Sequence, residues 1–143
     1  MASTGEIAIP GEAWKLSEEV TREVLSIINK YTSTRVEGGR GVYSRVTSGG
    51  HERVVGIGAY IEVVGEAPVG PVRDWLRANG FHLSNSISNT IDNEDRVWEQ
   101  WERTVGESGN STVIIKVDLG YIVVGDVGRL VIVLVYPIVD WRR

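Results

Sequence analysis

Residues 112–124 read TVIIKVDLGYIVV and residues 129–139 read RLVIVLVYPIV, with GDVG at 125–128 between them. Two runs rich in β-branched residues around a glycine-containing turn predict a β-hairpin. The second run is apolar at every position from Leu130 to Val135, which is typical of a strand buried on both faces. We therefore expect this strand to be central in an antiparallel sheet.

The apolar run that begins at Leu130 is too short for a membrane-spanning helix. The segment Leu130–Val139 is the longest apolar stretch and contains Pro137, whereas a membrane-spanning helix needs about 20 predominantly apolar residues. The first ten residues do not combine a basic region with an apolar run, so no secretory signal is expected. These features predict a soluble chain with no membrane partner and a cytoplasmic location.

A second hairpin is predicted nearer the N-terminus. Two strand-like runs, Val42–Thr47 and Arg53–Val64, flank Ser48-Gly49-Gly50, which has the composition of a hairpin tip. Alternation in the second run predicts a core-facing set: Val55, Ile57, Ala59, Ile61 and Val63. Gly56 and Gly58 fall on the other face. They predict a bulge, a sharp twist or a close neighbour rather than a dinucleotide-binding loop, because the run continues as a strand.

Two helices have recognisable ends. The first is expected to begin with Ser17 as its N-cap, and its apolar residues repeat at helical spacing: Val20, Val24, Ile27, Ile28 and Tyr31. The second is predicted over Pro71–Asn79, with Gly80 as its left-handed stop. Leu76 and Phe81 are placed for the apolar contact of a Schellman motif.

A third helix is predicted over about Glu94–Val105. Its apolar residues form one stripe: Val97, Trp98, Trp101 and Val105. Glu99 and Arg103 stand at i,i+4 spacing on its solvated face. The preceding segment 82–93 is rich in serine and asparagine, and it is interpreted as a loop or a weak strand.

These elements follow the order α-ββ-α-α-ββ. Hairpins in place of βαβ crossovers predict an α+β fold, an antiparallel sheet built from two β-hairpins with helices packed on one face. Residues 1–10 carry no periodicity and are expected to form a flexible N-terminal arm, and residues 11–143 a single α+β domain. The predicted core comprises Val24, Ile28, Ile57, Ile61, Trp101, Ile115, Val133 and Val135. In element order alone, with a strand-rich ending after a helix, the chain resembles small phage tail-terminator and connector proteins, and fold order carries no function.

Composition limits the chemistry. The chain has 143 residues, a formal net charge of −4 and no cysteine, which excludes disulfides, thiolate nucleophiles and cysteine-bound metal centres. Its imidazoles belong to His51 and His82, and no nucleophile, base and orienting group fall together in the sequence. We therefore expect no catalytic residue, no metal site and no cofactor. Few thermolabile side chains and many β-branched residues are typical of a thermophilic source.

The ribbon of residues 35–53 is locally basic on an acidic protein. It carries the candidate nucleic-acid-binding residues Arg35, Arg40, Arg45, His51 and Arg53. A two-stranded ribbon fits the major groove of DNA, but arginines on an exposed ribbon also protect it from aggregation. The loop Glu37–Gly41 contains three glycines and an arginine. It is interpreted as a connection rather than a phosphate site, because no helix follows it.

Two further sets of residues are candidates. Lys116 and Asp118 share one face of their strand, opposite an apolar face, so they are candidates for lining a cleft. The C-terminal segment keeps large apolar side chains beyond a proline, and these form the candidate interface of a self-associating protein: Tyr136, Ile138, Val139 and Trp141. The alternative, with equal weight, is that this segment folds back on its own sheet.

The leading hypothesis from the sequence is a noncatalytic interaction or assembly module that forms a homo-oligomer. The alternative is a nucleic-acid-binding protein that uses the ribbon of residues 35–53. A third hypothesis is a small-ligand binder or enzyme with a cleft near Lys116 and Asp118. Self-association is thus the expected partner interaction, and the sequence identifies no small-molecule ligand.

Overall fold

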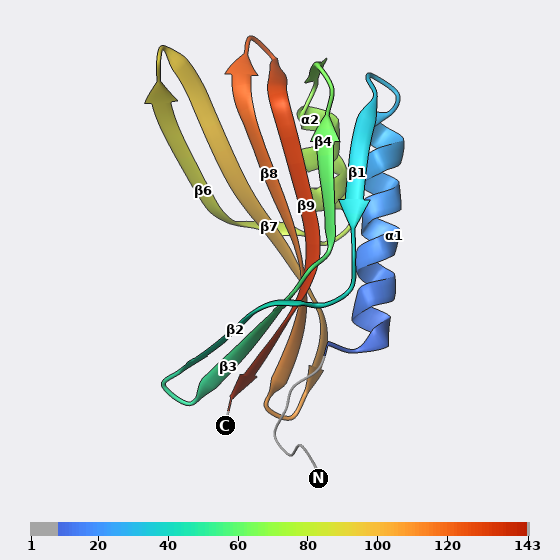
Figure 1. Ribbon diagram of the computed structural model, residues 1–143, viewed down its shortest axis with the longest axis vertical. Coiled ribbons are helices and arrows are strands. Elements are labelled where there is room, and N and C mark those ends of the chain that lie inside the picture. Colours follow the sequence, from blue (N-terminus) through green and yellow to red (C-terminus); the bar gives the residue numbers. More distant parts are fainter. Residues whose placement is uncertain (1–8, 143) are drawn as a thin grey trace.

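The structure is a computed structural model that describes residues 9–142, and over this range it contains two helices and nine strands (Figure 1). The helices are α1 (Gly11–Ile28) and α2 (Gly70–Ala78). The strands are β1 (Thr34–Gly38), β2 (Val42–Ser48), β3 (His51–Gly56), β4 (Ala59–Val63), β5 (Glu66–Ala67), β6 (His82–Ile91), β7 (Glu94–Ser108), β8 (Ser111–Val124) and β9 (Val127–Arg142). Residues 1–8 of the predicted N-terminal arm lie outside the described residues.

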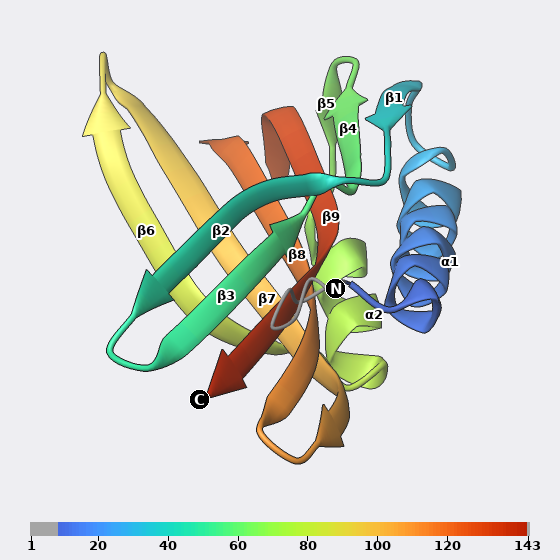
Figure 2. The ribbon, with the colours of Figure 1, turned by 60° about the horizontal axis from the view of Figure 1, so that its bottom comes forward.

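The strands of the described chain form one antiparallel sheet with the main order β1-β4-β9-β8-β7-β6. β9 lies at the centre, because it pairs with β8 along one side and with β5, β4 and β3 in turn along the other. The predicted central position of the last strand is therefore confirmed. In Figure 1 the tip of the β2–β3 hairpin and the turn of the β6–β7 hairpin point towards opposite ends of the molecule, and Figure 2 shows the same two hairpins from another side.

The run predicted as one strand over residues 53–64 is divided into β3 and β4. Val55 lies opposite Ile138 of β9, and Ala59 lies opposite Val135. Four steps along one strand therefore match three along the other, so the interruption at residues 56–58 is a one-residue bulge. The bulge faces the part of β9 that contains Pro137, which has no N–H group to donate to a ladder.

The bulge changes which side chains face the core. Val54 is fully buried and Val55 is half-buried, while Ile57 is 45% exposed. The predicted core position of Ile57 is therefore wrong, whereas the other seven predicted core residues are buried. A Cβ atom at Gly58 would lie 1.7 Å from the carbonyl oxygen of Val135. This close approach confirms the interpretation of the strand glycines as structural.

Helix α1 begins at Gly11, well before the predicted N-cap Ser17. Pro10 precedes the helix in an extended conformation, and its carbonyl oxygen accepts hydrogen bonds from the first turn at 3.0 and 3.3 Å. A proline is compatible with this place because the first N–H groups of a helix have no intrahelical partner. Ser17 is buried inside the helix, where its carbonyl oxygen accepts a hydrogen bond from Thr21 at 2.8 Å. The predicted helix start is thus wrong.

Helix α2 agrees with the prediction within one residue at each end. Pro71 lies in the first turn, and Gly80, with a φ of +82°, follows the helix in the left-handed region. The N–H group of Phe81 donates a hydrogen bond to the carbonyl oxygen of Leu76 at 2.9 Å, and both side chains are buried in the core. This bond and this burial confirm the predicted Schellman end.

The third predicted helix, over residues 94–105, is wrong because this segment is the strand β7. It forms a hairpin with β6, so residues 82–91 are a strand rather than a loop. Asp92 and Asn93 connect the two strands with φ values of +53° and +63°. Two consecutive left-handed residues are the mark of a type I′ hairpin turn, and asparagine and aspartate tolerate this conformation.

Side chains of β7 alternate between the two faces of the sheet. The ring of Trp98 covers Gly120 of β8, where a Cβ atom would lie 2.3 Å from a ring carbon. Glu99 is on the other face and bonds to Arg73 of α2. The predicted helical pair of Glu99 with Arg103 is therefore wrong.

Both helices cover the same face of the sheet, and one apolar core fills the space between these layers. Its fully buried members include Val24 of α1, Leu76 of α2, and the sheet residues Ile61, Ile115, Val117, Leu119, Val133 and Val135. The fold is thus α+β with a mostly antiparallel sheet, but its order is α-βββββ-α-ββββ rather than α-ββ-α-α-ββ. Neither of the two described helices is long and apolar enough to cross a membrane.

Candidate functional site

A groove of about 400 Å³ lies on the face of the sheet that is turned away from the helices. Its walls come from β2, β3, β4, β8, β9 and the bulge at residues 56–58. Its main lining side chains are Tyr43, Val55, Ile57, Tyr60, Asp118, Leu134 and Tyr136. Because these residues come from five strands, the groove exists only in the folded chain.

Asp118 is the buried acid of this groove. It is 4% exposed, and its carboxylate accepts hydrogen bonds from the hydroxyl of Tyr136 at 3.1 Å and from the side-chain amide of Gln100 at 3.5 Å. Burial raises the pKa of Asp118 above its ordinary value, although these hydrogen bonds and the charge of Lys116 oppose the shift. Burial and the neighbouring carboxyl group also raise the pKa of Tyr136. The groove therefore contains a phenol and a carboxyl group that are bonded to each other.

Lys116, the other residue of the predicted cleft, belongs to a different cluster. Its ammonium group lies 3.1 Å from one carboxylate oxygen of Glu102 and 3.5 Å from the hydroxyl of Ser84. His82 lies 3.4 Å from the other carboxylate oxygen of Glu102. Burial acts to raise the pKa of Glu102, but the hydrogen bond and charge of Lys116 and the charge of His82 outweigh it, so this pKa is lowered. Lys116 and Asp118 share a face, and of the two it is Asp118 that lines the groove.

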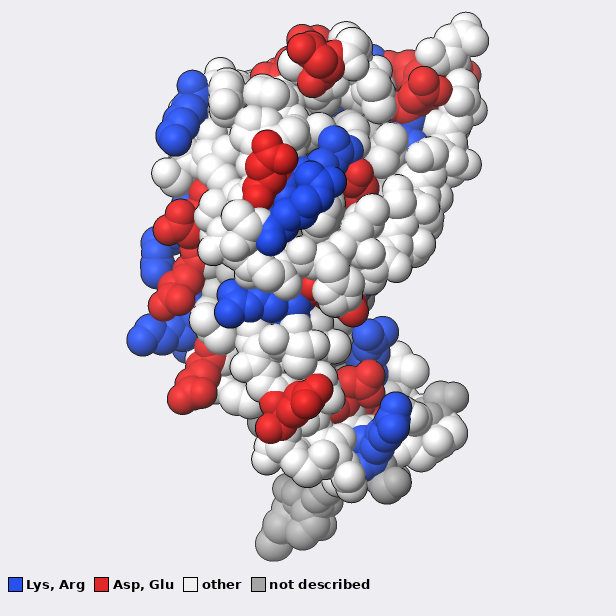
Figure 3. Space-filling model, turned by 180° about the vertical axis from the view of Figure 1, so that it is seen from behind, with Lys and Arg blue, Asp and Glu red and all other residues white. Residues whose placement is uncertain are grey.

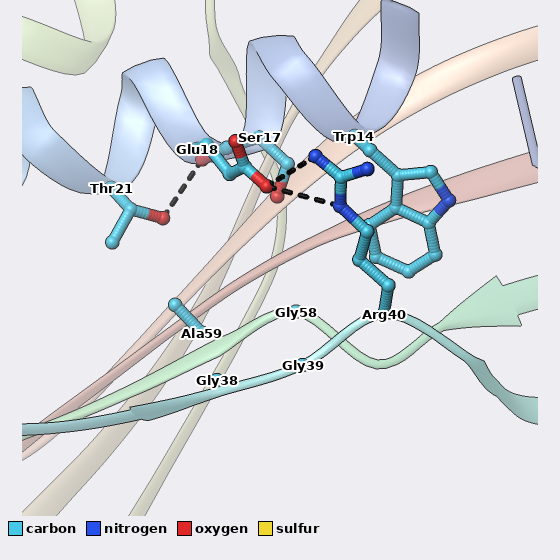
Figure 4. Close-up of a pocket in the computed structure, with 9 residues that line it drawn as sticks. All are labelled: Trp14, Ser17, Glu18, Thr21, Gly38, Gly39, Arg40, Gly58 and Ala59. Atoms are coloured by element: carbon cyan, nitrogen blue, oxygen red, sulfur yellow. Dashed lines mark hydrogen bonds and ion pairs between the residues drawn. The ribbon is translucent and has the colours of Figure 1, made fainter. Parts of the chain in front are cut away.

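A second hollow, of about 270 Å³, lies between α1 and the connection from β1 to β2 (Figure 4). The glycine-rich loop of residues 37–41 forms one of its walls. Arg40 is directed from this loop towards α1, where its Nε and Nη2 atoms donate hydrogen bonds to one carboxylate oxygen of Glu18 at 3.1 and 2.7 Å. The guanidinium group is thus already engaged by a carboxylate. This contact favours the interpretation of the loop as a connection.

Most of the candidate nucleic-acid-binding residues lie beside a carboxylate. The pairs are Arg35–Glu62, Arg40–Glu18, Arg45–Glu52 and His51–Asp140, at 3.6, 2.7, 3.6 and 3.6 Å. Arg53 is close enough to Glu102 for the two charges to interact. On the face shown in Figure 3, basic and acidic side chains are interspersed and form no continuous basic patch. The paired arginines are therefore partly neutralised, which weakens their attraction for a phosphate backbone.

The candidate interface residues at the C-terminus belong to β9. Ile138 and Val139 are buried, and both β3 and β8 pair with this part of the strand. Tyr136 lines the groove, and Trp141 is half-buried opposite Glu52 of β3. The segment therefore packs within the sheet of its own chain, which is the alternative considered from the sequence. Trp141 keeps part of its surface exposed.

The sequence predicts a loop or a weak strand over residues 82–93, but it does not predict that β6 is an exposed edge of the sheet. All ten of its residues are exposed, including Ile87 at 51% and Ile91 at 47%. It is the last strand in the sheet order, and no strand of residues 9–142 pairs with its outer edge. It contains no proline, aspartate, glutamate, lysine or arginine. The signal that indicates this hairpin is Asp92-Asn93, a pair suited to a type I′ turn.

Comparison with models of protein families, with curated proteins and with solved structures found no match for this chain. No group of three or more histidine, aspartate or glutamate side chains in residues 9–142 is arranged to hold a metal ion. A functional assignment for this chain therefore has to come from its own geometry.

Proposed function

We propose that this protein is a noncatalytic assembly module that forms a homo-oligomer, and that its copies meet through the outer edge of β6. The observation that carries the proposal is an exposed edge strand of ten residues with little protection against pairing. Natural sheets guard such edges with charges, prolines or covering elements, because free N–H and C=O groups pair readily with another strand. β6 has a bulge near Ser84, but it contains no proline, aspartate, glutamate, lysine or arginine, and no strand of residues 9–142 covers its outer edge.

The other free edges of the sheet differ from β6. β1 carries Arg35 and Glu37 within its five residues, and β2 carries Arg45. β6, in contrast, carries no aspartate, glutamate, lysine or arginine, and the charged side chains of its hairpin belong to β7. On a protein of net charge −4, a neutral edge lets two copies approach without repulsion at the contact.

The polar groups on this face of the sheet, both in the groove and in the cluster around Lys116, support a noncatalytic role. Asp118 is hydrogen-bonded to Tyr136, and Lys116 to Glu102. These bonds satisfy charged and polar groups on a partly buried face of the sheet, which is a structural task. Burial and the carboxyl group of Asp118 raise the pKa of Tyr136, which disfavours the phenolate that a proton-abstracting tyrosine would need.

Sedimentation velocity at about 10–100 μM, where weak interfaces still associate, tests the proposal. We expect the wild-type protein to sediment as an oligomer and Ile87→Lys as a monomer with unchanged far-ultraviolet circular dichroism, because lysine is the residue that most often protects an edge. Val36→Lys on β1 is the matched control, since Val36 is 44% exposed on the other edge, and it should leave the oligomer intact. A wild-type protein that is monomeric throughout this range would overturn the proposal.

The groove at Asp118 favours a second candidate function, the binding of a small organic cation. Three tyrosines and a carboxyl group line it, and aromatic rings with an acid are the groups that recognise ammonium ligands. A nuclear magnetic resonance titration with tetramethylammonium tests this function. We expect shifts of groove residues in the wild-type protein and about tenfold weaker binding by Asp118→Asn. Equal affinity of the two proteins, or no shifts at all, would contradict it.

A further inference from the structure

The middle of β6 reads the same in both directions. Residues 84–90 are Ser-Asn-Ser-Ile-Ser-Asn-Thr, and the segment Asn85–Asn89 is identical from either end, with Ile87 at its centre. The flanking residues Ser84 and Thr90 both carry hydroxyl groups. This symmetry matters for an edge strand, because two copies related by a two-fold axis present the same surface patch to each other. Their edge strands then pair antiparallel.

An axis at Ile87 brings like side chains together at every position of the palindrome. Ile87 faces Ile87 of the second copy, Ser86 faces Ser88, and Asn85 faces Asn89. Pairs of β-branched, hydroxyl and amide side chains stabilise neighbouring strands. A charged residue on the axis would instead face the same charge in the second copy, and the palindrome contains no charged residue.

The structure leaves the palindromic segment available for this pairing. Asn85 and Ile87 lie opposite Gln100 and Trp98 of β7, and the register between the two strands is regular from residue 85 to residue 91. The irregularity between residues 83 and 85 lies just outside the palindrome. The symmetric sequence therefore coincides with the regular and exposed part of the edge.

We infer that the homo-oligomer contains an antiparallel contact between two β6 strands with its two-fold axis at Ile87, which joins two sheets into one. This inference rests on the proposed assembly function, and it specifies the partner, the symmetry and the register. The same edge also permits a different contact, in which β6 pairs with β1 or β2 of the next copy. The palindrome favours the two-fold contact, because a pairing with β1 or β2 makes no use of the symmetry.

Single-cysteine variants report this contact without background, because the chain has no cysteine. Directly opposed residues of an antiparallel pair have Cβ atoms about 5 Å apart, close to what a disulfide needs. We expect Ile87→Cys to form a covalent dimer on mild oxidation, at twice the chain mass of 15.8 kDa. Asn85→Cys alone is the matched control, since the two copies of residue 85 lie four residues apart along the pair, about 13 Å.

A mixture of Asn85→Cys and Asn89→Cys tests the register itself. The mixture should cross-link about fivefold or more above either variant alone, because residue 85 faces residue 89. If the variants still sediment as oligomers but neither Ile87→Cys nor the mixture cross-links, the two-fold contact is overturned and the assembly function survives. A mixture of Ile87→Cys with Val36→Cys that cross-links preferentially would show pairing with β1 instead. A monomeric wild-type protein would overturn both proposals.

Discussion

Arg73 of α2 and Glu99 of β7 form a forked ion pair, in which Nε lies 3.0 Å from one carboxylate oxygen and Nη2 lies 2.6 Å from the other. Glu99 is 6% exposed, and the indole N–H of Trp101 also donates a hydrogen bond to its carboxylate at 3.2 Å. The hydroxyl of Tyr121 lies 3.4 Å from the same group. These four side chains form a hydrogen-bonded polar cluster that connects α2 to the sheet within an otherwise apolar contact.

Removal of the cation should destabilise the fold, because the carboxylate of Glu99 would stay in the core without its partner. We expect Arg73→Ala to lower the free energy of unfolding by about 3 kcal/mol, as for other largely buried pairs. Arg35→Ala is the control, because it breaks a pair with Glu62 whose side chains are 71% and 45% exposed. The control should cost less than about 1 kcal/mol. Urea unfolding measures both values, and equal losses in the free energy of unfolding would contradict the structural role of the polar cluster around Glu99.

A methyl group at Gly58 should disrupt the bulge between β3 and β4. The new Cβ atom would meet the backbone of β9, 1.7 Å from the carbonyl oxygen of Val135, and backbone atoms there cannot move without breaking the central ladder. We expect Gly58→Ala to cost about 3 kcal/mol or more. Gly39→Ala is the control, since the nearest atom to its Cβ lies 3.9 Å away on Ile57, and it should be neutral or slightly stabilising. Thermal melts of the two variants that coincide would contradict this account.

Local signals explain the parts of the fold that the sequence predicts well. The end of α2 depends on Gly80 and on residues within a few positions of it, and the β8–β9 hairpin depends on a glycine turn between two apolar runs. The sequence predicts a helix where β7 lies because its valines and tryptophans fit helical spacing. The interactions that fix its strand conformation are non-local: β7 pairs with β6 along one edge and with β8 along the other, where Gly120 leaves room for the ring of Trp98.

In the candidate site, too, the sequence predicts the local arrangement but not the contacts between distant strands. Period-two alternation predicts that Lys116 and Asp118 share a face, and the structure agrees. It does not predict that Lys116 bonds to Glu102 while Asp118 bonds to Tyr136, because these partners come from strands on opposite sides of β8. The sequence also does not predict the exposure of β6, since this exposure depends on the strand order of the whole sheet.

The raised pKa of Asp118 has a consequence for stability. A carboxyl group that binds its proton more tightly in the folded state stabilises the fold most below its unfolded pKa near 3.8, and this contribution is lost as the pH rises through the folded pKa. Asp118→Asn removes the charge and keeps an oxygen that accepts the bond from Tyr136. We expect the variant to be more stable than the wild-type protein at pH 7, with the difference vanishing as the pH falls towards 3.8. Urea midpoints measured across this range test the prediction.

Glu102→Gln should behave in the opposite way. The pKa of Glu102 is lowered, so its contribution is present above the unfolded value of 4.5 and is lost as the pH falls through the folded pKa. We expect the variant to be less stable than the wild-type protein at pH 7, with the gap closing in acid. If Asp118→Asn and Glu102→Gln shift the midpoint in the same direction at pH 7, the assigned environments of the two acids are wrong.

The carboxylates beside the ribbon arginines predict weak or absent binding to nucleic acid. We expect no retention of a labelled 20-base-pair duplex at low salt, about 50 mM, because the pairs of Arg35, Arg40 and Arg45 compete with phosphate contacts. A gel-shift assay checks this, with Glu18→Gln as the variant that frees Arg40. Wild-type retention that falls steeply with salt and is lost in an alanine variant of Arg40, Arg45 and Arg53 would instead support the nucleic-acid alternative.

Trp141 and Ile87 mark the two surfaces that compete as the interface between copies. Trp141 is half-buried and lies opposite Glu52 and Ser111 in its own sheet, so its loss opens packing within the chain.

We expect Trp141→Ala to lower the free energy of unfolding by about 2 kcal/mol and to leave the sedimentation coefficient of the folded protein unchanged. Ile87→Lys should instead turn the oligomer into a monomer and change the free energy of unfolding little, because Ile87 is exposed at the edge of the sheet. Sedimentation and urea unfolding on the same preparations separate these outcomes. If Trp141→Ala gives a folded monomer while Ile87→Lys remains an oligomer, the contact lies at the end of β9, because only a surface shared between copies changes the assembly state without changing the fold.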